Sequence, residues 1–252
     1  MRGIGKFREH FSPYKDCFVL IGGAACYLQM DNLGLDFRAT KDMDIILVVE
    51  AISDDFIASF WSFVRAGQYS TFQKSTGKHV FYRFHTPGDS DYPHMIELFS
   101  RAPIKLEDDT PGLLTPIPTQ DESISSLSAI LLDEDYYALL HSGTEILLDL
   151  PVLNPEYILL FKAKAWIDLT ERQRAGETVD SKTIKKHRND VLRISQIIAA
   201  TPSIQLPDHV ANDLKFFLQE LEKESQTLSD LGIKNMTIEE IISILCKKFE
   251  VD

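Results

Sequence analysis

The stretch Lys41-Asp42-Met43-Asp44-Ile45-Ile46-Leu47-Val48-Val49 places two carboxylates directly before an apolar run. The run is short and rich in β-branched residues, which is typical of a buried strand. If the strand includes Asp42 and Asp44, its period of two puts both carboxylates on one face and Met43 on the other. Adjacent carboxylates repel each other unless a cation lies between them, and Mg²⁺ commonly takes one or two carboxylates together with substrate phosphates. The stretch therefore predicts a metal site; the alternative is two solvated aspartates where a strand begins.

A pair of glycines lies upstream of these aspartates. The apolar run 17–21 predicts a buried strand, Gly22-Gly23 interrupts it, and residues 24–30 are expected to form a helix. Glycine lets another group approach the backbone closely, and the free N–H groups of the first helical turn point at that place. The pattern predicts a phosphate-binding turn, although most Gly-Gly pairs are simply turns.

A single acidic residue, Glu97, interrupts the apolar pattern of residues 94–99, which predict another strand. A carboxylate is costly to bury unless it is paired or bound to a metal. Glu97 is therefore a candidate third metal ligand. The alternative is a solvent-facing residue of a half-exposed strand.

The remaining pattern predicts an α/β (α+β) protein with an N-terminal half of strands and helices and a helical C-terminal half. We expect three parts, which are a catalytic domain over 1–122, connecting strands over 123–153 and a helical domain over 154–252. Further helices are expected over 2–12, from Ser53, over 134–141, from Asn154 to about 175, from 180 or 181 to about 200, from Pro207 and from Thr237. Further strands are expected over 79–85, 130–132 and 146–150, and a loop over 103–122.

The charge of the chain restricts its partners. The formal net charge is −12, which argues against general coating of nucleic acid. Residues 154–200 nevertheless carry nine basic against six acidic side chains, which suits an anionic ligand held at one place.

No apolar segment has the length of a membrane span and the N-terminus does not resemble a secretory signal, so we expect a cytoplasmic protein with no membrane partner. The histidines show no spacing typical of metal ligands.

The ordered set of motifs resembles the nucleotidyltransferase fold of the polymerase-beta type. It most closely resembles the AbiEii-type abortive-infection nucleotidyltransferases, the toxins of bacterial type IV toxin–antitoxin systems. The resemblance covers about residues 17 to 195. The matching segments are Ile21-Gly22-Gly23-Ala24-Ala25, Arg38-Ala39-Thr40-Lys41-Asp42-Met43-Asp44-Ile45, Ile96-Glu97-Leu98, Leu159-Leu160-Phe161-Lys162-Ala163-Lys164-Ala165 and Lys186-His187-Arg188-Asn189-Asp190. The chain departs from the family pattern at His187, which replaces the first aspartate of a KDxxD motif, and at Glu97, where aspartate is more usual.

The resemblance implies a role for each candidate residue. Asp42, Asp44 and Glu97 would hold Mg²⁺ or Mn²⁺ for a two-metal mechanism. Gly22 and Gly23 would bind phosphate. Lys162 or Lys164 would neutralise the triphosphate, but residues two apart on a helix face different sides, so only one of them can do so. Lys162 fits the family spacing better. The further candidates for contact with the nucleotide or the acceptor are Lys186, Arg188 and Asp190, whose alternative is a solvated helix face.

The activity implied by the resemblance is transfer of a nucleoside monophosphate from an NTP to a hydroxyl group. The acceptor would be an RNA, such as a tRNA end, or a protein, and a small-molecule acceptor also fits the fold. The biological role would be that of a growth-inhibiting toxin in phage defence, neutralised by a cognate antitoxin. The alternative from another class is a non-catalytic nucleotidyltransferase-like binding or regulatory module, which we would expect to have lost one of the three carboxylates.

Overall fold

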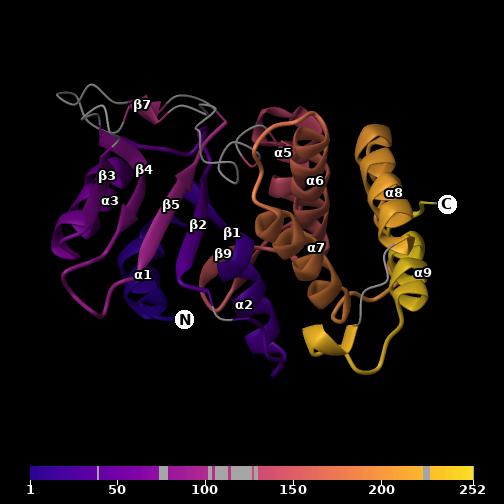
Figure 1. Cartoon of the computed structure of the whole chain (residues 1–252). Coiled ribbons are helices and arrows are strands. Elements are labelled where there is room, and N and C mark those ends of the chain that lie inside the picture. The colour runs from indigo at the N-terminus through magenta and orange to yellow at the C-terminus, as the bar shows by residue number, and fades with distance from the viewer. Residues whose placement is uncertain are drawn as a thin grey trace. The chain divides into compact units, whose positions relative to one another are not determined.

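In the computed structural model, the chain forms two compact units (Figure 1). The structure describes residues 1–38, 40–73, 79–101, 104–105, 113–114, 127, 130–223 and 228–251. The sheet unit comprises residues 1–117 and 144–154, and the helical unit comprises residues 118–143 and 155–252. The segment 123–153, expected to connect two domains, is thus divided between the two units.

The sheet unit contains a mixed sheet that, over the described residues, has seven strands in the order β3-β4-β5-β2-β1-β9-β8. The strands are β1 (Phe18–Ile21), β2 (Asp42–Leu47), β3 (Ser70–Gln73), β4 (His79–His85), β5 (Met95–Phe99), β8 (Thr144–Leu147) and β9 (Leu150–Leu153). Strand β2 runs parallel to β5 on one side and antiparallel to β1 on the other, and β1 runs parallel to β9. The expected α/β class with a mixed sheet is confirmed.

Two helices cover one face of this sheet with an aromatic core. Helices α1 (Ile4–Phe11) and α3 (Asp54–Ala66) contribute phenylalanines, and the Phe7 and Phe11 rings lie 4.5 Å apart. The ring of Phe84 on β4 lies 5.3 Å from that of Phe60 on α3, and Ile45 of β2 points toward the same cluster. The residues that alternate with Ile45 along β2 therefore lie on the opposite face.

Strand β1 leads directly into helix α2 (Gly22–Asn32), which packs against β1 and β2. The helix begins at Gly22, two residues earlier than the sequence pattern indicated. A short 3₁₀ segment, η1 (Ser12–Cys17), joins α1 to β1. Ser53 caps α3 as expected, because its hydroxyl oxygen accepts a hydrogen bond of 3.2 Å from the Phe56 N–H.

Several expectations for the middle of the chain are wrong. Residues 130–132 are helical rather than extended, because three consecutive apolar residues fit the buried side of either element. The strand expected over 146–150 is a hairpin of β8 and β9, whose turn residues Leu148 and Asp149 have φ of 50° and 68°. The loop expected over 103–122 contains a paired β6 (Ile104–Lys105) and β7 (Leu113–Leu114), and its other residues lie outside the described part of the chain. Strand β3 was not predicted.

The helices after residue 154 follow the sequence pattern, except that the helix expected to end near residue 200 ends at Ser195. The described elements of the helical unit are α5 (Glu134–Ser142), α6 (Pro155–Arg174), α7 (Ser181–Ser195), α8 (Asp208–Glu222), η2 (Leu228–Leu231) and α9 (Ile238–Phe249). Helix α6 packs against α7 and α8. Thr237 and Glu240 form the expected capping box at the start of α9. No helix in the described part of the chain is both long enough and apolar enough to cross a bilayer.

Candidate functional site

The three acidic residues predicted from the sequence lie on one face of the sheet. Asp44 on β2 stands in register with Glu97 on the parallel strand β5. Asp42 precedes Asp44 by two residues and so shares its face. Met43, between the two aspartates, is fully buried on the face that carries the aromatic core. The sheet therefore places the side chains of Asp42, Asp44 and Glu97 on the same face.

The turn between β1 and α2 lies against the same carboxylate cluster. Ile21, the last residue of β1, is in register with Asp44. Gly22 has a φ of 63°, and a Cβ at Gly22 would overlap the Asp44 carboxylate. The Gly23 N–H donates a hydrogen bond of 3.4 Å to Asp44 Oδ2, so the first turn of α2 stabilises that negative charge. The predicted phosphate-binding turn thus lies against Asp44, one of the three predicted metal ligands.

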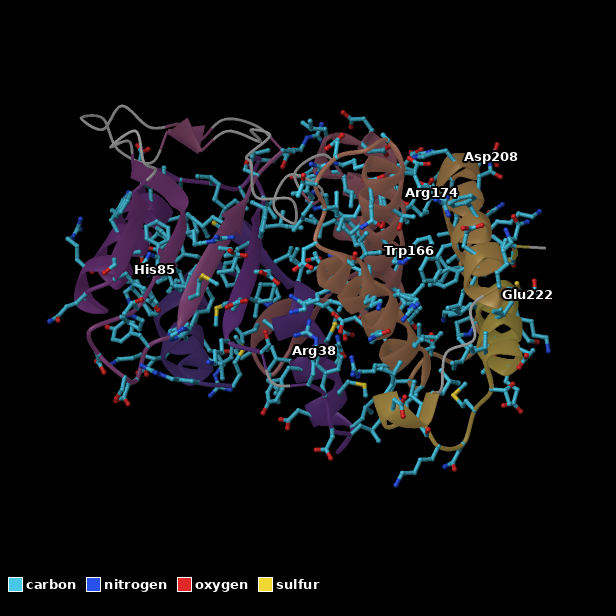
Figure 2. The ribbon with its side chains drawn as sticks, in the orientation of Figure 1. Arg38, His85, Trp166, Arg174, Asp208 and Glu222 are labelled. Atoms are coloured by element: carbon cyan, nitrogen blue, oxygen red, sulfur yellow. The ribbon has the colours of Figure 1, made fainter. Side chains whose placement is uncertain are left out.

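Two residues before β2 contact the start of α2. The Thr40 hydroxyl donates a hydrogen bond of 3.3 Å to the Asp42 carbonyl oxygen. A Cβ at Gly23 would lie 2.9 Å from Thr40 Oγ1 and 3.4 Å from Arg38 Nη2. Arg38 therefore brings a guanidinium beside the glycine turn (Figure 2). The sequence identified Arg38 and Thr40 only as part of a motif, without roles.

The structure adds Arg83, which the sequence analysis did not single out. Arg83 on β4 is in register with Glu97 on the neighbouring β5, and its Nε donates a hydrogen bond to Glu97 Oε1. The two side chains are 21% and 10% exposed, so the pair is largely shielded from water. Nothing in the order of residues 79–85 indicated this contact, because the pairing of β4 with β5 decides which residue faces Glu97.

The surroundings of Glu97 raise the pKa of its carboxyl group. Burial raises the pKa of Glu97 to about 7, and the negative charge of Asp44 acts in the same direction. The Arg83 guanidinium opposes this rise by favouring the charged carboxylate. A carboxyl group in this range can accept or release a proton near neutral pH.

The donor set on this face fits a hard divalent cation. Three carboxylates on one face offer the oxygen ligands that Mg²⁺ and Mn²⁺ prefer. The ligand atoms of these three carboxylates do not all lie within 4.8 Å of one another. Among the described residues, that spacing is met only by the ligand atoms of Asp133, Asp135 and His209.

The group Asp133, Asp135 and His209, in the helical unit, could hold a metal ion. His209 Nε2 lies 3.1 Å from Asp133 Oδ2, and His209 Nδ1 lies 3.0 Å from Asp135 Oδ2. Asp133 also caps α5, since its Oδ1 accepts hydrogen bonds from the N–H groups of Asp135 and Tyr136. No spacing pattern indicated this group, because Asp133 and His209 are 76 residues apart.

Lys162 and Lys164, both in the helical unit, point in different directions, as their spacing predicts. Lys162 Nζ lies 3.0 Å from Oδ2 of Asp190 on α7, and Asp190 is fully buried. Lys164 Nζ lies 3.3 Å from carboxylate oxygens of Asp168 and Asp213. Lys162 and Asp190, both taken from the family motif, are therefore direct partners.

The other two candidates lie on α7. Lys186 is exposed, whereas Arg188 is buried and donates from Nη2 to Asn189 Oδ1 at 3.2 Å. All five predicted nucleotide-binding residues after residue 154 belong to the helical unit, and the carboxylates and glycines belong to the sheet unit.

Comparisons with protein-family models, with curated proteins and with solved structures find no match to this chain. The interpretation of the site therefore rests on its residues and their geometry.

Proposed function

We propose that the chain is a metal-dependent nucleotidyltransferase that moves a nucleoside monophosphate from an NTP to an acceptor hydroxyl. The observation that carries this proposal is the placement of Asp42, Asp44 and Glu97 on one face of β2 and β5. The start of α2 lies against the same carboxylates through Gly22 and Gly23. Carboxylates that can hold a cation and backbone N–H groups that can face phosphate are two features that phosphoryl-transfer sites commonly use.

The candidate residues of the sheet unit each have a role in this reaction. Asp42 and Asp44 would hold Mg²⁺ or Mn²⁺, and the ion would supply positive charge that neutralises the triphosphate. Gly23 and the following N–H groups face phosphate oxygens. The acceptor oxygen forms a bond to the α-phosphorus as the bond to the bridging oxygen of the β-phosphate breaks, and pyrophosphate leaves with that electron pair. Glu97 accepts the proton of the acceptor hydroxyl, a role suited to a pKa of about 7.

The acceptor is proposed as an RNA, such as a tRNA end, or a protein side chain. The basic excess over residues 154–200 supports an RNA end held locally, since the chain as a whole is acidic. A growth-inhibiting activity controlled by a cognate antitoxin is the biological role we propose for such an enzyme.

A non-catalytic binding module is the second candidate function. The observation that favours it is that the fold neutralises several of its own candidate residues. Glu97 is paired with Arg83 and Lys162 with Asp190, so both pairs are stable without a nucleotide. A module of this kind would bind an NTP or a partner but transfer nothing.

A label-transfer assay tests the proposal. The purified protein is incubated with Mg²⁺, each α-labelled NTP in turn, and bacterial RNA together with cell lysate. The Asp42→Ala/Asp44→Ala variant serves as the inactive control. His209→Gln is the matched control, because it removes the other possible metal group and should leave the activity unchanged.

Label on one macromolecule that depends on Asp42 and Asp44 supports the enzyme and identifies its nucleotide and acceptor class. Nucleotide binding that depends on Mg²⁺ and on both aspartates, without transfer to RNA, protein or small molecules, favours the binding module. Activity lost in His209→Gln but kept in the aspartate variant would move the reaction to the helical unit and overturn the proposal.

A further inference from the structure

The group formed by Asp133, Asp135 and His209 joins the starts of two helices of the helical unit. Asp133 is the N-cap of α5, Asp135 lies in the first turn of that helix, and His209 lies in the first turn of α8. His209 Nε2 lies 3.1 Å from Asp133 Oδ2, and His209 Nδ1 lies 3.0 Å from Asp135 Oδ2. The imidazole ring therefore has a carboxylate oxygen at each of its two nitrogen atoms.

These two contacts cannot both be hydrogen bonds of a neutral imidazole. A neutral ring carries one N–H donor and one nitrogen that accepts, and an ionised carboxylate only accepts. One of the two contacts, at 3.0 or 3.1 Å, would then bring two acceptors together, which is repulsive. In the described part of the chain, neither Asp133 nor Asp135 forms an ion pair with a lysine or an arginine. The arrangement therefore needs a positive charge, which is either a further proton on the group or a metal ion.

The starts of α5 and α8 are also held together by a contact outside this group. One turn further along both helices, the hydroxyl of the fully buried Tyr136 donates a hydrogen bond of 3.0 Å to Asp213 Oδ2. The Asp133 carboxylate is oriented as well, because its Oδ1 accepts hydrogen bonds from the N–H groups of Asp135 and Tyr136, and its Oδ2 lies against His209. Ligands that are oriented by their neighbours in this way lose little conformational freedom when they bind an ion.

We propose that Asp133, Asp135 and His209 bind one Zn²⁺ ion, which links α5 to α8. One ligand atom from each residue lies within 4.8 Å of the other two, so small side-chain movements bring all three to the same ion. An imidazole together with carboxylates suits Zn²⁺ better than Mg²⁺, which prefers oxygen ligands alone. The ion is structural and takes no part in the proposed transfer reaction, so either proposal can fail without the other. The competing explanation is an imidazolium that pairs with both aspartates and binds no metal.

Calorimetric titration with ZnCl₂ near neutral pH separates the two explanations. The full-length parent protein carries Asp42→Asn/Asp44→Asn, so that the candidate ligands of the sheet unit do not contribute to binding. In this background we compare His209→Gln and Asp135→Asn with the matched control His141→Gln, which replaces an exposed histidine in the last turn of α5. Urea unfolding of each variant in EDTA shows whether it is folded before zinc is added.

We expect the parent protein to bind one equivalent of Zn²⁺ that His141→Gln retains and that His209→Gln binds about 100-fold more weakly or not at all. Asp135→Asn should weaken binding by about tenfold or more, which gives an independent result if His209→Gln does not fold. Zinc binding that is absent from the parent protein, or equally strong in the parent, His209→Gln and Asp135→Asn, would overturn the inference and leave the imidazolium pair. The proposed function is decided separately, by label transfer with the protein that retains Asp42 and Asp44.

Discussion

Asp44 is in contact with, or in register with, most parts of the candidate site. It stands in register with Glu97 across the parallel strand pair. Its carboxylate accepts a hydrogen bond from the Gly23 N–H at the start of α2. Gly22 passes so close to its carboxylate that a side chain at Gly22 has no room. A change at any of these neighbours should therefore act on Asp44 as well as on local stability.

Replacement of Gly22 by alanine tests this close approach. The left-handed φ of 63° costs a residue with a Cβ about 1–2 kcal/mol, and the overlap with the Asp44 carboxylate adds to this. We expect Gly22→Ala to lower the free energy of unfolding by about 2 kcal/mol or more, measured by urea denaturation, and to weaken Mn²⁺ binding. Gly5→Ala is the control: Gly5 lies within α1 with open space around it, so this variant should be about 0.5–1 kcal/mol more stable. Equal effects of the two substitutions would contradict the geometry.

The raised pKa of Glu97 predicts a pH dependence of stability in the metal-free protein. The pKa rises from 4.5 to about 7 on folding, so the folded state binds the proton more tightly than the unfolded state. Its contribution is complete below pH ~4.5 and is lost as the pH rises through about 7, which amounts to up to about 3 kcal/mol. Glu97→Gln should remove this decline, as measured by urea unfolding in EDTA from pH 4.5 to 8.

The slope with pH is the informative quantity, because Glu97→Gln also changes the partner of Arg83 and so shifts stability at every pH. Glu222→Gln, at the exposed end of α8, should leave the slope unchanged (Figure 2). A Glu97→Gln slope equal to that of the unmodified protein would show that Glu97 titrates no differently in the folded and unfolded states.

At the scale of elements, a buried ion pair joins α6 to α7. Lys162 and Asp190 lie 3.0 Å apart with almost no exposure, and Arg193 Nη1 lies 3.7 Å from the same carboxylate. Two charges removed from water are stable only as partners. This gives Lys162 a structural role within the helical unit, whatever it contributes to nucleotide binding.

Replacing one partner of this ion pair should lower the free energy of unfolding more than replacing both. Lys162→Met takes the ammonium group of the closest ion pair away from the buried Asp190 carboxylate, and we expect a loss of about 3 kcal/mol in unfolding free energy. The double variant Lys162→Met/Asp190→Asn should recover part of that loss. Lys182→Met, an exposed control on α7, should change stability by less than about 0.5 kcal/mol. Additive losses in a double-mutant cycle of chemical unfolding would show that the two side chains do not interact.

Local patterns predicted most of the elements and the carboxylate face. Alternation along β2 separated Asp42 and Asp44 from Met43, and capping residues such as Ser53 located helix starts correctly. The pattern was insufficient where a segment is short. Residues 130–132 have too few apolar positions to show a period, and the four-residue β3 has no clear alternation.

The parts of the site that could not be predicted depend on strand order and helix packing. Arg83 meets Glu97 only because β4 lies next to β5 in the sheet. Likewise, His209 meets Asp133 only because the starts of α8 and α5 come together in the helical unit. Such contacts join residues that are distant in the sequence, so no spacing rule identifies them.

At the scale of the whole molecule, the chain passes from the sheet unit to the helical unit and back before it ends in helices. Residues 144–154 return to the sheet and supply β9, which pairs with β1 at Leu20 and Val152. The boundary expected at residue 122 would therefore separate β1 from one of its two neighbouring strands. It would also leave the N–H and C=O groups on that side of β1 without their partners.

A fragment of residues 1–122 should therefore fail to form a stable domain. It lacks β8 and β9, so β1 becomes an edge strand whose four residues are all buried in the full protein. We expect the fragment to aggregate or to unfold without a cooperative transition, measured by urea denaturation with circular dichroism and by size-exclusion chromatography. Residues 1–117 joined by a flexible linker to 144–154 are the matched comparison, since they contain every strand of the seven-stranded sheet, and should unfold cooperatively. A cooperative, monomeric 1–122 fragment would mean that the β8–β9 hairpin is dispensable and that the sheet unit is complete without it.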